Sequence, residues 1–173
     1  STLSNANEIA PRGSFCLVNT TPEEMLKLVE NYAKNIAEAK RSYVAVGLPS
    51  EKVGGKVYGD GMTVIRVGAI HEYGLGNNPR RSFLSVPFTT KKTSLSRLID
   101  NQFNDVLLMK SDTKKALGII GIAATNIAKG AFTTRGYDVW PDIKQGTKNS
   151  KGSSQPLIDT GTLRNSITSV IRS

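Results

Sequence analysis

Cysteine and histidine are almost missing from this chain. Its 173 residues include one cysteine, Cys16, and one histidine, His71. A single cysteine excludes a disulfide within the chain and a zinc site built on several thiolates, and a single histidine excludes a histidine-rich metal site. The sequence therefore predicts no metal site and no cofactor, and it removes much of catalytic chemistry from consideration.

Long apolar runs are lacking as well. The longest apolar stretch, residues 116–128, is broken by two glycines and by Thr125 and Asn126. It is shorter than the roughly 20 residues that cross a bilayer. Residues 1–10 lack the basic-then-apolar order of a signal peptide. We therefore expect no contact with a membrane and synthesis in the cytoplasm.

Acidic residues are absent from one region of an otherwise mixed sequence. Residues 79–97 contain five basic residues and no acid, and the whole chain has a formal net charge of +9. Such an excess permits contact with DNA phosphates or with an acidic protein partner, and it also fits a plain uncompensated surface. The residues expected to make such a contact are Lys91, Lys92, Lys144, Lys148 and Lys151.

The composition is that of one globular domain. Hydrophobic residues make up 38% and charged residues 21% of the chain, which is typical of a folded protein of this length. We predict an N-terminal arm over residues 1–20 and a single domain over residues 21–173. Within that domain, residues 144–155 are rich in Gly, Ser and Lys and predict a flexible loop.

Helical patterns cover three segments. The first runs from Pro22 to about Arg41, where Thr21 and Glu24 form a Thr-x-x-Glu capping box. Its apolar stripe is expected to bury against a sheet, and it consists of Met25, Leu28, Val29, Tyr32 and Ile36. The second helix is predicted over residues 83–109.

The third predicted helix, residues 113–132, is apolar around much of its circumference, so we expect it to be the most buried element. Gly118 and Gly121 lower its helix propensity. We expect that they permit the close approach of another backbone.

Strand patterns cover residues 42–47, 62–70 and 167–171. We predict that the first two form an antiparallel pair, with a third short strand near residues 56–58 and a loop over residues 71–81. The expected fold class is α/β (α+β), with a small, mainly antiparallel sheet packed by about three helices. An extended N-terminal arm and a C-terminal loop complete it.

Catalytic motifs fail on inspection. His71 and Glu72 begin like His-Glu-x-x-His, but the second histidine position holds Leu75. No Gly-x-Ser-x-Gly elbow exists to expose a serine, although composition alone leaves a Ser–His–Asp triad open. Trp140 lies in a Trp-Pro turn and is interpreted as a packing anchor. The sequence therefore predicts no catalytic residues and a protein that is not an enzyme.

Two sequence motifs, which occur in the same order in one group of proteins, provide a family resemblance. The first ends in His-Glu-Tyr-Gly at residues 71–74 and continues as Pro-Arg-Arg-Ser-Phe-Leu at residues 79–84. The second is Pro-Leu-Ile-Asp-Thr-Gly-Thr-Leu-Arg-Asn-Ser-Ile at residues 156–167. Together they resemble the virion-morphogenesis and tail-completion families of long-tailed bacteriophages. The resemblance covers about residues 60–172.

The resemblance implies an α/β fold, no enzymatic activity and a hexameric ring at the head–tail junction of the virion. The expected partners are further copies of the chain, a tail terminator or tail tube protein, and a head-closure or connector protein. DNA passing through the lumen is a further expected contact. The main alternative is a tail terminator or head-closure ring. The alternative from another class is a free basic DNA-binding protein.

The two motifs contain most of the residues expected to form an interface or to specify the fold. A loop stiffened by Pro79, with arginines beside an aromatic ring, suits a protein–protein contact. In the second motif Asp159 is expected to cap a turn, and Leu163 and Ile167 share one face. Specifying the fold alone is an equally open reading. The full set is Glu72, Tyr73, Pro79, Arg80, Arg81, Phe83, Trp140, Asp159, Leu163 and Arg164.

Overall fold

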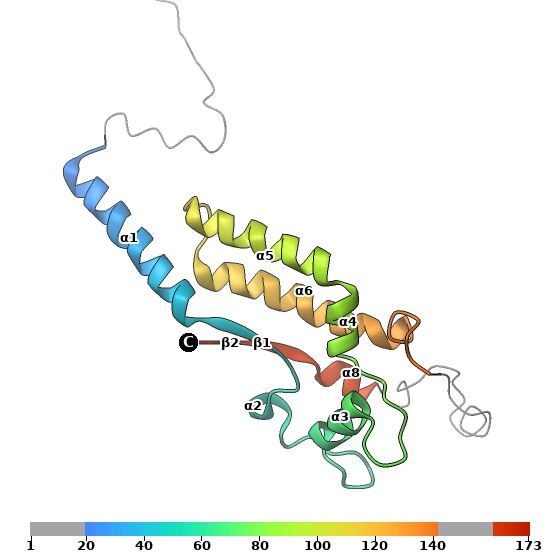
Figure 1. Cartoon of the computed structure of the whole chain (residues 1–173). Coiled ribbons are helices and arrows are strands. Elements are labelled where there is room, and N and C mark those ends of the chain that lie inside the picture. Colours follow the sequence, from blue (N-terminus) through green and yellow to red (C-terminus); the bar gives the residue numbers. More distant parts are fainter. Residues whose placement is uncertain (1–19, 142–160) are drawn as a thin grey trace, which may run out of the picture.

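A computed structural model describes residues 20–141 and 161–173, and it has the α+β fold that the sequence predicts (Figure 1). Within these residues a two-stranded antiparallel sheet packs against helices. The elements in chain order are α1 (Pro22–Arg41), β1 (Tyr43–Gly47), α2 (Ser50–Val53), α3 (Val64–Tyr73), α4 (Ser85–Thr90), α5 (Lys92–Leu107), α6 (Thr113–Thr133), α8 (Thr162–Ser166) and β2 (Thr168–Arg172).

Helix α6 is the centre of the fold. Figure 1 shows α5 running along one side of α6 while β1 and β2 lie on the other. The helix begins where Asp112 Oδ1 accepts a hydrogen bond of 2.7 Å from Lys115 N. It has more buried residues than any other described helix, so that prediction is confirmed. Its length and composition alone would also suit a membrane span, but here it is the core helix around which the other elements pack.

The sheet joins two segments that are far apart in the sequence. Strand β1 pairs with β2, with Val44 opposite Ile171 and Val46 opposite Ser169. The last predicted strand is therefore confirmed, whereas the predicted pairing of residues 42–47 with 62–70 is wrong. A Cβ atom added at Gly121 would lie 2.8 Å from Ser169 Oγ and 2.9 Å from Val44 Cγ2. Glycine at this position lets α6 approach both strands.

The same expectation is wrong for Gly118, the first glycine of α6. A Cβ atom added at Gly118 would meet nothing within 4 Å, so no neighbouring element requires a glycine there.

Residues 64–73 form helix α3, so the strand predicted over residues 62–70 is wrong. Thr63 caps the helix, because its Oγ1 accepts a hydrogen bond of 3.3 Å from Arg66 N. Val64, Gly68 and Glu72 are its buried residues, and their spacing of four places them on one helical face. The third predicted strand, near residues 56–58, is reduced to a single bridge between Val57 and Thr63.

Helix α1 has the predicted ends but not the predicted burial. Its capping box is present, with Thr21 Oγ1 accepting from Glu24 N at 3.2 Å and Glu24 Oε2 accepting from Thr21 N at 2.9 Å. No residue of α1 is buried, however, so the expectation that its apolar stripe packs against a sheet is wrong. The helix contacts α5 and α6, where Thr113 Oγ1 donates to Asn35 O at 2.9 Å.

The helix predicted over residues 83–109 is two helices. Helix α4 ends and α5 begins at Lys91, directly after Thr89 and Thr90, which are weak helix formers. The break allows α4 and α5 to contact α6 separately.

Candidate contact site around Glu72

The first motif surrounds an aromatic core. The rings of Phe83 and Phe132 are 5.6 Å apart between centroids, and Trp140 meets Phe132 edge-on, also at 5.6 Å. Leu163 and Ile167 from the second motif are buried in the same cluster. The two motifs therefore meet in space, and their large apolar side chains form one core between α3, α6 and α8.

A buried carboxylate lies at the edge of this core. Glu72, at the end of α3, accepts four hydrogen bonds from the chain that leads into α4. Its Oε1 accepts from Ser82 Oγ at 2.7 Å and from Ser85 N at 3.1 Å. Its Oε2 accepts from Phe83 N at 2.9 Å and from Leu84 N at 3.0 Å. Charged acceptors form the stronger class of hydrogen bond, and here they compensate for burial of the charge.

The loop between α3 and α4, residues 74–84, is held at further points. Arg81 N donates to His71 O at 2.8 Å, and Arg80 Nε donates to Glu72 O at 3.1 Å. Arg81 Nε donates to Pro141 O at 3.3 Å. The indole Nε1 of Trp140 donates to Ser82 O at 2.8 Å. These bonds fix the loop to α3 on one side and to the segment after α6 on the other.

The glycine at the start of this loop is required by geometry. Gly74 ends α3 with a φ of +71°, and a Cβ atom there would lie within 3.1 Å of the Arg80 backbone. A left-handed glycine that closes a helix is a common C-terminal cap.

Apolar side chains of this fixed region face solvent. Tyr73 is 69% exposed and Leu75 is 50% exposed, and Pro79 and Arg80 are exposed beside them. A backbone held by many hydrogen bonds loses little conformational entropy when a partner binds. The loop of residues 74–84 would therefore lose little conformational entropy if a partner bound to it.

The structure divides the residues expected to form an interface or specify the fold into two groups. Glu72, Arg81, Phe83, Trp140 and Leu163 are buried, so they specify the fold, and Trp140 is the packing anchor that was predicted. The exposed members are Tyr73, Pro79, Arg80 and Arg164. Asp159 lies outside the described residues.

The predicted basic contact residues are only partly described. Lys91 is half-buried, and its Nζ lies over the Tyr137 ring, 5.0 Å from the centroid. Lys92 is exposed at the start of α5. Burial raises the pKa of the Tyr137 hydroxyl, which donates a hydrogen bond of 3.0 Å to Ile127 O. Lys144, Lys148 and Lys151 lie outside the described residues.

Sequence reasoning missed Ser82. Its buried hydroxyl donates to Glu72 and accepts a hydrogen bond of 3.1 Å from Val86 N. Serine just before a helix is a known capping signal, and Ser82 directly precedes the helix predicted from residue 83. In the structure α4 begins at Ser85, and the Ser82 hydroxyl bonds Glu72 as well as Val86 N; the bond to Glu72 depends on a tertiary contact that no local signal shows.

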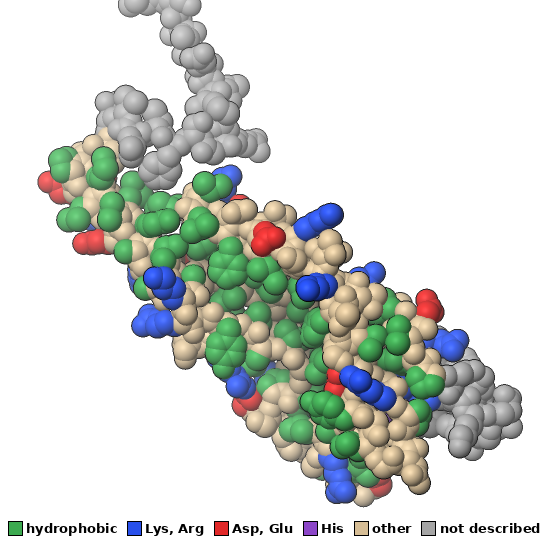
Figure 2. Space-filling model, viewed as in Figure 1, with side chains coloured by type: hydrophobic (Ala, Val, Ile, Leu, Met, Phe, Trp, Pro, Cys, Tyr) green, Lys and Arg blue, Asp and Glu red, His purple; other side chains and the backbone are tan. Residues whose placement is uncertain are grey.

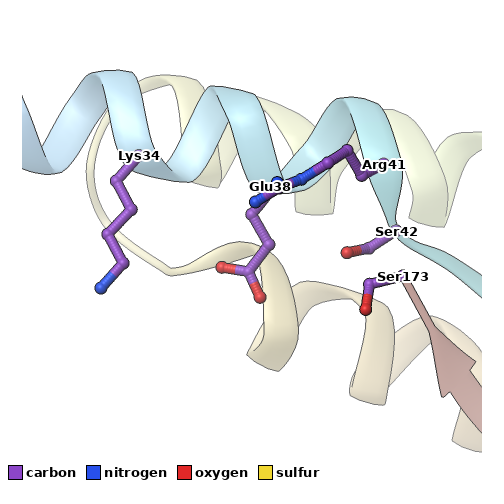
Figure 3. Close-up of a pocket in the computed structure, with 5 residues that line it drawn as sticks. All are labelled: Lys34, Glu38, Arg41, Ser42 and Ser173. Atoms are coloured by element: carbon purple, nitrogen blue, oxygen red, sulfur yellow. The ribbon is translucent and has the colours of Figure 1, made fainter.

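Elsewhere the described surface holds a shallow hollow beside α1, lined by Lys34, Glu38, Arg41, Ser42 and Ser173 (Figure 3). Figure 3 shows that its long charged side chains come from α1 and that Ser173, at the chain end after β2, lies beside Ser42. In residues 20–141 and 161–173 there is no group of three His, Cys, Asp or Glu side chains that would hold a metal ion.

Searches of protein-family models, of curated proteins and of solved structures found no match to this chain.

Proposed function

We propose that this chain is a structural protein of a tailed-phage particle that assembles into a ring at the head–tail junction. The observation that carries the proposal is the loop of residues 74–84. A buried carboxylate at Glu72 holds its backbone, while Tyr73 at the end of α3 and Leu75 in the loop remain exposed. The motif residues that resemble tail-completion proteins are the ones that build and present this loop.

A ring requires each copy to use two different surfaces, because head-to-tail contacts close only when rotation brings the last copy to the first. In the proposed ring, the exposed side chains of Tyr73 and Leu75 form one of these surfaces and dock on a neighbouring copy. A rigid loop with an aromatic side chain and an adjacent arginine has the composition of an energetic centre in protein interfaces. The tail tube or terminator and the head connector are the proposed partners of the assembled ring.

The test is to change the loop without disturbing the fold. Tyr73→Asp introduces a charge at a side chain that faces solvent, so the free energy of unfolding should change little. The proposed ring should dissociate, since a desolvated carboxylate at a contact is unfavourable. The measurement is the solution mass by light scattering beside a urea unfolding curve.

Val57→Asp is the matched control, because Val57 is also an exposed apolar residue but lies between α2 and α3. Dissociation by Tyr73→Asp alone supports the proposed contact. Unchanged assembly in Tyr73→Asp would remove this loop from the ring interface.

A further inference from the structure

Helix α1 presents an apolar side that nothing in the described structure covers. Leu26 is 60% exposed and Val29 is 59% exposed, and Met25 and Tyr32 beside them also face solvent. Figure 2 shows apolar side chains gathered at the surface of this end of the molecule. A 20-residue helix without a single buried residue has little packing to stabilise it, since amphipathic helices depend on burial of their apolar side.

The charges along α1 are divided by sign. Residues 22–31 contain three glutamates and one lysine, a net charge of −2. Residues 32–41 contain two lysines, one arginine and one glutamate, a net charge of +2. Glu23 and Glu24 lie in the first turn, and Lys40 and Arg41 lie in the last.

This division makes α1 complementary to itself in one orientation only. In an antiparallel pair the acidic half of each helix lies beside the basic half of the other, and the two helix dipoles are also opposed. In a parallel pair, halves of the same sign would face each other. We propose that α1 is an interface between two copies of this chain, in which the two α1 helices pack antiparallel through the side that carries Leu26 and Val29.

Such a contact uses the same surface on both copies, so it closes as a dimer and adds no further copies. It is therefore distinct from the ring, which needs two different surfaces, and it does not depend on the proposed phage function. Burial of the apolar side stabilises the contact, and the charges determine the antiparallel orientation.

Disulfide cross-linking tests the orientation. Cys16 is replaced with serine, and single cysteines are placed at Leu26, Val29, Ala33 and Ala37, which lie along the exposed side of α1. In an antiparallel pair the middle positions lie near their own copies. Position 26 of one copy lies opposite position 37 of the other, and these positions are about 16 Å apart along a helix. Residue 26 is therefore about 16 Å from residue 26 of the other copy, which is too far for a disulfide, and the same holds for residue 37.

The expected result is a cross-linked dimer for Ala33→Cys alone, and for Val29→Cys when it is mixed with Ala33→Cys. Leu26→Cys and Ala37→Cys should each stay uncross-linked alone and should cross-link when the two variants are mixed. Efficient cross-linking of Leu26→Cys with itself would indicate parallel pairing and would overturn the proposal. Absence of any cross-link at all four positions would overturn it too, and would leave α1 for another segment of the chain or another protein.

Sedimentation velocity supplies an independent readout on the chain without added cysteines. Val29→Lys should raise the dissociation constant of the two-copy contact at least tenfold, because it buries a charge in the apolar side. Asn31→Lys adds the same residue on a different side of the same helix and should leave the constant within about threefold. Equal effects of the two substitutions would contradict the proposed surface. Circular dichroism of both variants verifies that α1 remains helical.

Discussion

At the scale of single residues, Glu72 explains most of the first motif. Its two carboxylate oxygens each accept two hydrogen bonds, three from the backbone of residues 83–85 and one from the Ser82 hydroxyl. Arg81 and Trp140 hold the same stretch from outside. The His71-Glu72 pair begins like a metal-binding motif, but in the structure Glu72 fixes the conformation of the loop before α4.

Replacement of Glu72 by glutamine should lower the free energy of unfolding by about 2–4 kcal/mol. Both oxygens accept from donors, so either orientation of the amide places its NH2 group against donors that then lack an acceptor. Urea unfolding followed by circular dichroism measures the loss. Asp100→Asn, on the exposed side of α5, is the control and should change stability by less than about 0.5 kcal/mol. A Glu72→Gln chain as stable as the natural one would mean that the loop is held by other contacts.

At the scale of elements, local signals predicted some helices closely and failed where packing decides. The ends of α1 followed from its capping box, and α6 followed from its apolar composition. Residues 64–70 are rich in β-branched side chains, and they still form a helix because Val64, Gly68 and Glu72 share one buried face. Propensity is a weak signal when tertiary contacts favour the other conformation.

The sheet illustrates a different limit. Strand β1 pairs with a segment more than 120 residues later, and no local pattern specifies such a partner. The same holds for the site: the first motif's residues were identified from the sequence, but the grouping of Glu72 with Ser82 required the turn that brings α3 to α4. The exposure of α1 was not predicted, because a periodic apolar stripe indicates burial but does not distinguish burial within the chain from burial against a second chain.

Gly118 and Gly121 of α6 should respond in opposite directions to substitution. Gly118→Ala should raise the free energy of unfolding by about 0.5–1 kcal/mol, because alanine favours the helix and meets no neighbour. Gly121→Val should lower it by about 1–3 kcal/mol, since its side chain would collide with Val44 and Ser169. Thermal or urea unfolding of the two variants tests this pair. Stabilisation by both substitutions would show that the sheet does not pack as closely on α6 as described.

At the scale of the whole molecule, the two exposed apolar groups that are proposed as contacts lie on separate elements. One group lies on α1, and the other, Tyr73 and Leu75, lies on the end of α3 and the loop after it. The first is complementary to itself and suits the proposed two-copy contact, whereas the second is proposed as one of the two surfaces of a ring. If both contacts form, two rings join through α1, and the assembly has twice the mass of one ring.

The most direct test of the ring is the mass of the purified chain by light scattering across a range of concentrations. Six copies of an 18.7 kDa chain predict a species of about 112 kDa, or twice that mass where α1 joins two rings. The proposal predicts that this species forms as concentration rises and that it is absent for Tyr73→Asp. A mass that stays at one or two chains at every concentration would contradict the ring.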